Sequence, residues 1–430
     1  MRRALAVLAL ASCAGQTGTV TLELTTAPGS TLLDGVQHLR VTVTDPHTVV
    51  ESDRTESGFD LALEIDATGA AGALVVEGFD SGGSLIAAGS SPPFPVAAIS
   101  ARIVVYMAQP LTIGSSPARL PASRTGVASA PLTFGLVLAG GQDAAGAKTD
   151  AIFIYNAYDH SLLGGLPMPA PRAFQTLAVG SNNAVSIFGG VDATDIPSGS
   201  LWRFDTTAPP SGSYNVLPEQ PALARQASSA IQLGPERFVI TGTPPIDLAL
   251  TTLTPRTDLA SLPPNGAAVS VAGQRIGLFA DHPIHRLQGD SFDELAVSVE
   301  PTATVTALSD GRVAFVGPDT PASRDVLVVL VADGTAARIP GVLSTERQRA
   351  AAAASTRYLV VAGGADLLGA PIANADVLDA TTLARIATIP CFPRTGATAY
   401  LLPNDQIAIV GGEPANDVIE LFTPPPIDLP

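Results

Sequence analysis

Arginines recur at comparable points along the second part of this chain, and each one precedes a short run of small side chains. A guanidinium is a planar fork of N–H donors that matches the oxygens of a carboxylate or a phosphate. The repetition suggests a set of anion-binding groups. The alternative is that each arginine pairs with an acidic group or a carbonyl of the neighbouring repeat. The arginines are Arg124, Arg172, Arg225, Arg349 and Arg394.

One close pair of histidines has the residue types of a metal site, because His282 and His285 follow Asp281. Pro283 interrupts any helical face between them, and no further cluster of His, Cys or Glu completes a site along the sequence. We therefore predict a solvated loop at this point and no metal.

Segment 141–149 is close to a phosphate-binding loop, with glycines ahead of Lys148 and Thr149. It carries one residue too many before the lysine. A strand pattern follows it, instead of the helix whose N-terminus would bind the phosphate. The segment is therefore predicted to be a plain loop, and the sequence predicts no cofactor.

The first residues have the layout of a secretory signal, with Arg2 and Arg3 ahead of a short apolar run. The tetrapeptide that ends at Cys13 resembles the bacterial lipobox, in which the cysteine is lipidated after the signal is cut. That resemblance implies a signal peptide at 1–12, a lipidated tether at 13–18 and an anchor in the outer membrane, since Ala14 is not the aspartate of inner-membrane retention. It leaves open whether the protein faces the periplasm or the cell surface. The alternative is an ordinary signal peptide.

The chain holds two cysteines, so lipidation of Cys13 would leave Cys391 without a disulfide partner. Cys391 follows an expected strand, and we predict a buried, inert thiol.

Composition predicts an all-β protein. The 430 residues include 40 Gly and 37 Pro, and short β-branched runs alternate with these turn formers. The mean hydropathy is +0.32, and the apolar residues are spread over many short runs, none of which approaches the roughly 18 residues of a membrane span. The net charge of −16 argues against binding to nucleic acid.

Residues 19–110 show clean alternation of apolar and polar side chains, for example at Leu39, Val41 and Val43. Alternation with period two indicates strands with one buried face. Five or more such strands over about 90 residues fit an immunoglobulin- or fibronectin-like β-sandwich. We expect a spacer or adhesive module without chemistry of its own.

Residues 111–430 contain a repeat. A buried strand that ends in a turn, most often Gly-Gly, occurs seven times at intervals of about 37 to 53 residues, and a second strand follows the turn. Units of four short strands are blades of a β-propeller. The glycine pair, the following strand and the period resemble kelch repeats. Seven blades are expected, with six or eight left open because the middle units are irregular.

The last unit supplies only three strands within residues 394–422. Residues 112–121 precede Arg124 as the segment before Arg172 precedes the second unit. We therefore expect 112–121 to form the missing outer strand and to close the ring.

The kelch resemblance implies that the strand opening each unit lines a central channel, which would place Arg124, Arg172, Arg225, Arg349 and Arg394 around one mouth. Copper oxidases and sialidases also use propellers, but their ligand and Asp-box patterns are absent. The sequence thus predicts a monomeric, noncatalytic envelope lipoprotein. It would bind or scaffold a protein or anionic glycan through its propeller. The alternative is an oxidase-like or glycan-acting enzyme with its site at the channel mouth.

Overall fold

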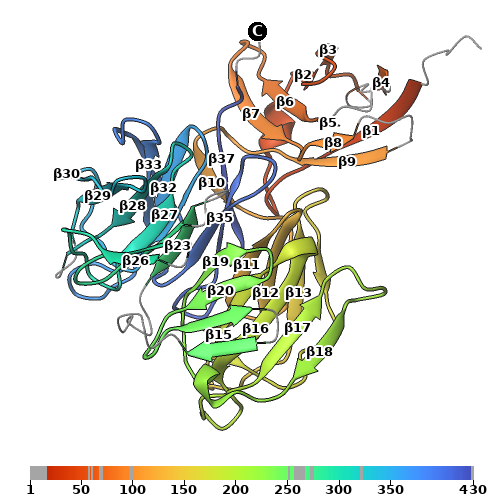
Figure 1. Ribbon diagram of the computed structural model, residues 1–430. Helices are drawn as coiled ribbons and strands as arrows, with labels where there is room; N and C mark the ends of the chain where they lie inside the picture. Colours follow the sequence, from red (N-terminus) through yellow and green to blue (C-terminus); the bar gives the residue numbers. More distant parts are fainter. Residues whose placement is uncertain are drawn as a thin grey trace, which may run out of the picture.

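The computed structural model describes residues 17–56, 59, 62–66, 71–95, 101–249, 252–255, 267–271, 276–289, 291–319 and 323–427. Within these ranges the regular elements are strands and three short 3-10 turns (Figure 1). The prediction of an all-β protein is therefore confirmed. No helix among these residues has the length and apolarity that crossing a membrane requires.

Residues 17–106 form three small sheets, which lie at the top of Figure 1. β1 (Thr17–Thr25) lies between β4 (Ala62–Asp66) and β9 (Ala101–Tyr106), antiparallel to β4 and parallel to β9. A second sheet has the order β3 (Thr48–Asp53), β2 (His38–Val43), β6 (Leu74–Phe79) and β7 (Leu85–Ser90). The short strands β5 (Ala71–Gly72) and β8 (Phe94–Pro95) pair with each other.

The first two of these sheets share one hydrophobic core. Leu39, Val41 and Val76 of the second sheet and Val105 of the first are fully buried in the same cluster. Alternate residues of β2 and β6 point into this cluster, because side chains along a strand alternate between the faces.

From residue 112 to residue 423 the described chain forms seven antiparallel sheets of four strands each. Sheet 1 contains β11 (Ala128–Leu132), β12 (Gly135–Ala139), β13 (Ile152–Asn156) and β14 (Leu162–Gly164). Sheet 2 contains β15 (Ala173–Val179), β16 (Ala184–Val191), β17 (Leu201–Asp205) and β18 (Ser213–Leu217). Sheet 3 contains β19 (Ala230–Gly234), β20 (Arg237–Ile240), β21 (Ile246–Ala249) and β22 (Thr252–Pro255).

Sheets 4 to 7 follow the same pattern. Sheet 4 contains β23 (Ala268–Val271), β24 (Ile276–Phe279), β25 (His285–Gln288) and β26 (Ser291–Glu294). Sheet 5 contains β27 (Thr304–Ala307), β28 (Arg312–Val316), β29 (Val326–Leu330) and β30 (Ala336–Ile339). Sheet 6 contains β31 (Ala351–Ala354), β32 (Tyr358–Ala362), β33 (Asn374–Asp379) and β34 (Arg385–Pro390). Sheet 7 contains β35 (Thr398–Leu401), β36 (Ile407–Val410), β37 (Glu420–Thr423) and β10 (Thr112–Ser115).

The seven sheets contact one another in cyclic order. The first strand of each sheet contacts the first strand of the next, and β35 of sheet 7 contacts β11 of sheet 1. The second strand of each sheet lies between two hydrophobic cores, because its side chains alternate between the two faces of the sheet. Leu136 and Leu138 of β12 pack against sheet 7, whereas Val137 and Ala139 of the same strand pack against sheet 2. Each pair of neighbouring sheets thus shares one hydrophobic core.

β10 completes sheet 7 from the other end of the ring. Its residues pair antiparallel with β37, with Ile113 opposite Phe422. Backbone bonds extend the ladder at both ends, from Leu111 N–H to Thr423 O (2.9 Å) and from Ser116 N–H to Ile419 O (2.8 Å). The segment expected to supply the outer strand therefore lies beside β37.

Candidate functional site: the central cavity and the repeat-start arginines

The guanidinium of Arg172 is buried within its own sheet. The residue is 2% exposed, and its Nη groups donate to Gly189 O (2.8 Å) and Ser200 Oγ (2.8 Å). The guanidinium carbon lies 4.4 Å from the centre of the Trp202 ring. Burial lowers the pKa of Arg172 from its usual value. These contacts use both Nη groups of the guanidinium.

Arg225 and Arg394 make corresponding contacts. Arg225 Nη1 donates to Thr241 O at 2.7 Å. Arg394 is 1% exposed; Nη1 donates to Gly411 O (3.2 Å) and Nη2 to Glu420 Oε2 (2.8 Å). Burial in turn raises the pKa of Glu420, and the neighbouring guanidinium opposes that rise. Each arginine therefore binds the turn that ends the second strand of its own sheet.

The backbone carbonyls of these arginines bind the preceding sheet. They accept the N–H of the second glycine of its turn, in the pairs Gly141–Arg172 (2.9 Å), Gly190–Arg225 (2.6 Å) and Gly364–Arg394 (2.8 Å). The preceding residue of the turn must be glycine, because a Cβ there would lie 2.3 to 2.5 Å from the arginine carbonyl oxygen. This holds for Gly140 on Arg172, Gly189 on Arg225, Gly317 on Arg347 and Gly363 on Arg394. The arginines thus link successive sheets.

In sheet 6 this role belongs to Arg347 and not to Arg349, which corrects our alignment of the repeats. Arg347 Nη1 donates to Gly363 O (2.9 Å), and Nη2 lies 2.9 Å from Asp376 Oδ2, with both side chains fully buried. The separation between Arg349 and Gly364, the last residue of the turn in sheet 6, is 15 residues, which is shorter than the corresponding separation in the other units. Counting from Arg347 restores 364 − 347 = 17 residues, the spacing from Arg124 to Gly141.

Arg124 holds the start of sheet 1 to sheet 7 through its backbone. Its N–H donates to Asn416 O (3.0 Å), and its carbonyl accepts from Asn416 N–H (3.2 Å). Its side chain is partly buried, and Nε is buried without a hydrogen-bond partner among the described residues. The structure therefore does not gather the five arginines on one surface.

The residue two positions after each of these linking arginines has a left-handed backbone. The residues are Gly126 (φ 62°), Phe174 (φ 56°), Ala227 (φ 49°), Arg349 (φ 51°) and Gly396 (φ 66°). Backbone bonds connect them around the ring, from Phe174 N–H to Gly126 O (2.9 Å), from Ala227 N–H to Phe174 O (2.9 Å) and from Gly396 N–H to Arg349 O (2.8 Å). We call this set the mouth ring.

The mouth ring opens onto two adjoining cavities of about 520 and 830 Å³, a size that suits small ligands. Both are lined by Arg349, Gly396, Thr398 and Tyr400, and together they reach residues at the start of all seven sheets. Small and hydroxyl-bearing side chains make up most of the lining. Its charged side chains are Arg349 and Glu413, whose Nη2 and Oε2 lie 3.8 Å apart, each about half exposed at 48%.

Three polar atoms in the lining of the smaller cavity are buried without a hydrogen-bond partner among the described residues. They are Gln175 Oε1, Ser228 Oγ and Thr395 Oγ1, on residues that are 4%, 8% and 7% exposed. A buried polar atom without a hydrogen-bond partner costs free energy, so each of these side chains gains if it turns toward a partner in the cavity. The three atoms come from sheets 2, 3 and 7, so only ring closure brings them to one cavity.

The histidine pair is not a solvated loop throughout, which corrects that prediction. His285 lies in β25, is 3% exposed and stacks on Phe292 at 5.0 Å. Its Nδ1 lies 3.4 Å from Asp281 Oδ2, while His282 is half exposed. No group of three or more potential metal ligands occurs in the part of the chain that the structure describes.

Cys391 and segment 141–149 line neither of the two central cavities. Cys391 follows β34, is partly buried and has no disulfide; burial raises its pKa to about 11. Segment 141–149 is a loop between β12 and β13, in which Asp143 Oδ1 accepts the N–H groups of Ala145 and Ala147 (both 2.9 Å) and Lys148 pairs with Asp195. Cys13 and the expected signal peptide lie outside the described residues.

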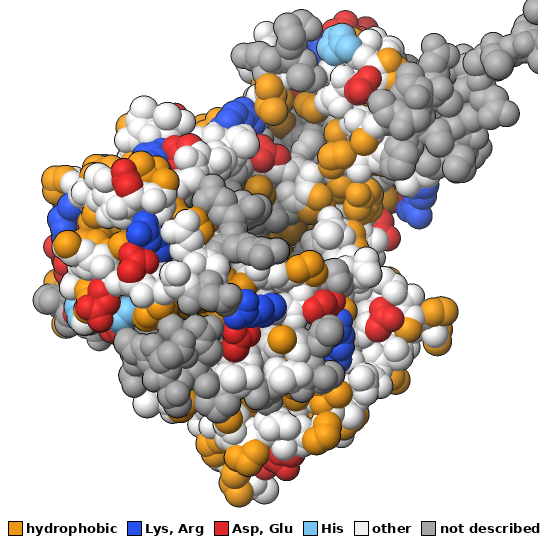
Figure 2. Space-filling view, in the orientation of Figure 1, with side chains coloured by type: hydrophobic (Ala, Val, Ile, Leu, Met, Phe, Trp, Pro, Cys, Tyr) orange, Lys and Arg blue, Asp and Glu red, His pale blue; other side chains and the backbone are white. Residues whose placement is uncertain are grey.

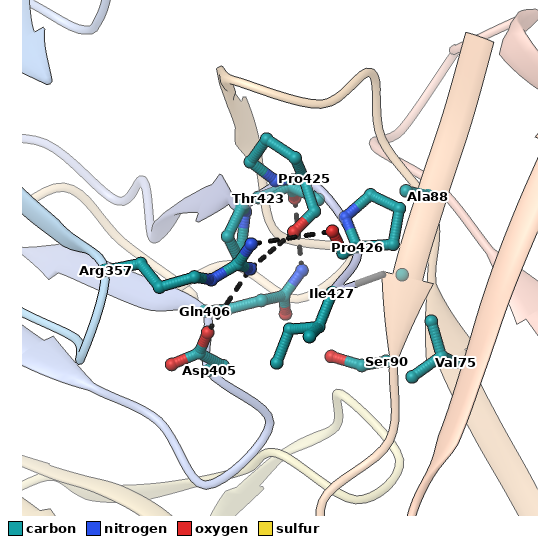
Figure 3. Close-up of a pocket in the computed structure, with 12 residues that line it drawn as sticks. Val75, Ala88, Ser90, Arg357, Asp405, Gln406, Thr423, Pro425, Pro426 and Ile427 are labelled. Atoms are coloured by element: carbon teal, nitrogen blue, oxygen red, sulfur yellow. Dashed lines mark hydrogen bonds and ion pairs between the residues drawn. The ribbon is translucent and has the colours of Figure 1, made fainter. Parts of the chain in front are cut away.

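A separate, much smaller cavity of about 60 Å³ lies between sheet 7 and the second N-terminal sheet (Figure 3). Arg357 reaches into it, donating to Pro425 O (2.5 Å) and lying 3.8 Å from Asp405 Oδ2. Beside it, Ser90 Oγ donates to Asn404 O at 2.6 Å. Its volume suits one or two waters, and its contacts join the N-terminal sheets to the ring.

Sequence reasoning missed most of the central lining. It named Arg349 but not Phe174, Gln175, Ser228 or Glu413. A usable signal was present in the sequence. The residue two positions after each linking arginine belongs to the mouth ring, once Arg347 replaces Arg349 in the comparison of the repeats. On the face shown in Figure 2, acidic and basic side chains are interspersed and form no single charged patch.

A comparison with family models and with curated proteins found no match to this chain.

Proposed function

We propose that this chain is a noncatalytic binding module whose ligand occupies the central cavity of a seven-bladed, kelch-like β-propeller. The N-terminal sheets would be an immunoglobulin- or fibronectin-like sandwich that acts as a spacer. The support for a propeller is the cyclic order of contacts, with one core between each pair of sheets and β10 beside β37.

The observation that carries the binding proposal is the smaller cavity at the mouth ring. Three buried polar atoms there have no partner among the described residues, and Arg349 has only a loose ion pair at 3.8 Å. Histidine and cysteine, the most frequent acid–base and nucleophilic groups, are absent from the described lining of both cavities. A cavity with unused hydrogen-bonding capacity suits binding better than acid–base chemistry.

The test is ligand retention by the full chain purified in detergent. The protein is incubated with envelope glycans and small peptides, separated from free compounds by gel filtration and analysed by mass spectrometry. Thr398→Trp would fill the cavity, because Thr398 is exposed and lines both parts of it. Leu368→Trp is the control, at a loop residue 93% exposed. We expect a compound retained by wild type and by the control but lost in Thr398→Trp. If no retained compound depends on residue 398, the cavity is not the binding site.

We further propose that Cys13 is lipidated and holds the protein at the outer membrane. The support is the lipobox-like tetrapeptide directly after an apolar run. Metabolic labelling with a palmitate analogue should mark wild type and leave Cys13→Ser unmarked, with Cys391→Ser as the control. Equal labelling of Cys13→Ser and wild type would reject this anchor.

A further inference from the structure

Phe174 and Arg349 hold large side chains in a backbone conformation that favours glycine. Their φ angles are 56° and 51°, and the same position in sheets 1 and 7 is occupied by Gly126 and Gly396. A Cβ in the left-handed region costs free energy, and such strain tends to persist at ligand sites. Two of the five mouth-ring residues therefore carry strain together with the largest side chains of the set.

The two side chains extend toward each other over those glycines. A Cβ at Gly126 would lie 2.7 Å from the Phe174 ring, and a Cβ at Gly396 would lie 2.9 Å from Arg349 Nη2. The Arg349 side chain of sheet 6 thus lies over Gly396 of sheet 7, and the Phe174 ring of sheet 2 lies over Gly126 of sheet 1. Because sheets 7 and 1 are neighbours, the two side chains flank the closure of the ring.

The groups that face the smaller cavity between them are chemically mixed. Phe174 is partly exposed and offers an aromatic face, whose negative potential attracts weakly positive C–H groups. Arg349 makes no side-chain hydrogen bond within the described residues, only the loose pair with Glu413. Gln175, Ser228 and Thr395 stand in the cavity wall, and rotation of their side chains would bring a buried, unpartnered amide oxygen and two hydroxyls to a ligand.

We propose that this mouth binds a sugar residue that bears a carboxylate, of the uronic acid type. The inference rests on the proposed binding function and names its ligand class. Arg349 takes the carboxylate, Phe174 takes the C–H face of the ring, and the unpartnered amide and hydroxyl atoms take sugar hydroxyls. A simple phosphate would leave the aromatic face unused, and a peptide C-terminus offers too few hydroxyls for the three atoms.

The test is calorimetric titration of the full chain in detergent with methyl β-glucuronide and with its neutral counterpart, methyl β-glucoside. Wild type should bind the glucuronide at least about tenfold more tightly, the scale of one charge-assisted contact. Arg349→Gln should remove that preference and leave weak binding of both sugars. Phe174→Gly should weaken both sugars alike, because the aromatic face serves the ring and not the charge.

A matched control separates binding from strain. Asn182→Gly relieves the same left-handed conformation (φ 54°) at an exposed residue of sheet 2 that lines neither of the two cavities. It should bind the glucuronide like wild type, with an equal or higher Tm. Arg349→Gly should show an equal or higher Tm as well, yet lose the preference for the glucuronide.

Several results would overturn the inference. These are equal affinity of wild type for the two sugars, an undiminished preference in Arg349→Gln, no binding of the glucuronide by folded wild type, and Arg349-dependent binding of N-acetylphenylalanine in place of the sugar. None of these results decides whether wild type retains another compound that Thr398→Trp loses. The proposed ligand class can therefore be wrong while the proposed binding function still holds.

Discussion

Two arginines that lie two residues apart, Arg347 and Arg349, have opposite environments. Arg347 is fully buried and bonded to Asp376, whereas Arg349 lies at the cavity with about half of its side chain exposed. Removing one partner of a buried ion pair leaves an uncompensated charge, which costs far more than the loss of an exposed pair. The residue type is the same, so the difference comes entirely from position.

The first prediction follows from this contrast. Arg347→Met should lower the free energy of unfolding by roughly 3–5 kcal/mol, because the Asp376 carboxylate stays buried without its cation. Ser344 N–H (3.0 Å) and Thr388 Oγ1 (2.8 Å) still donate to that carboxylate and keep the loss finite. Urea denaturation measures the change. Arg349→Met is the control, expected within about 0.5 kcal/mol of wild type; similar losses for both variants would contradict this assignment.

At the scale of elements, a buried polar cluster lies where β13, β10 and β9 meet. His160 Nδ1 is 2.8 Å from Tyr155 OH, Tyr106 OH donates to Ser115 O (3.1 Å), and His160 is 2% exposed. Burial lowers the pKa of His160 to about 4, with the charge of Asp159 opposing the shift. The imidazole is therefore neutral in the folded protein and takes a proton readily only after unfolding.

The second prediction concerns acid stability. The folded-state pKa of His160 is below its ordinary value of roughly 6.5, so the unfolded chain binds more protons between those values. Stability from this group is complete above about pH 6.5 and is lost as the pH falls toward 4, by on the order of 3 kcal/mol.

His160→Gln should flatten that part of the stability profile, measured by thermal melting from pH 4 to pH 8. The exposed His47→Gln is the matched control and should keep the wild-type slope. If the His160 variant retains the full slope, the acid sensitivity arises elsewhere.

At the scale of the whole molecule, the pairing of β10 with β37 brings together segments about 300 residues apart in sequence and completes sheet 7. Ile113 of β10 packs in the core shared by sheets 6 and 7, together with Val360 and Phe422. The outer strand thus covers an apolar surface that would otherwise meet water.

The third prediction tests that closure. Ile113→Asp places a carboxylate in the shared core and should cost roughly 2–4 kcal/mol, measured by urea denaturation. Ile386→Asp is the matched control, since Ile386 also lies in the outermost strand of its sheet, β34, but is 46% exposed. A loss confined to Ile113→Asp supports the closure, whereas equal losses would show that β10 does not seal the core.

Local pattern was sufficient for much of the architecture. Period-two alternation and glycine turns are properties of a few consecutive residues, so the sequence by itself predicted the all-β class and seven repeated units. The segment before Arg124 could be assigned to the last unit because the repeats could be compared in order. The N-terminal alternation at Leu39, Val41 and Val43 likewise placed those residues on a buried face.

The tertiary structure alone decided the site. Arg347 and Arg349 are the same residue type two positions apart, and the structure shows which one links sheets, because the carbonyl oxygen of Arg347 packs on Gly317 of the neighbouring sheet. Phe174, Ser228 and Thr395 belong to different sheets and reach one cavity only because the ring closes between sheets 7 and 1. Proximity across a closed ring is set by packing between sheets, and no short stretch of sequence encodes it.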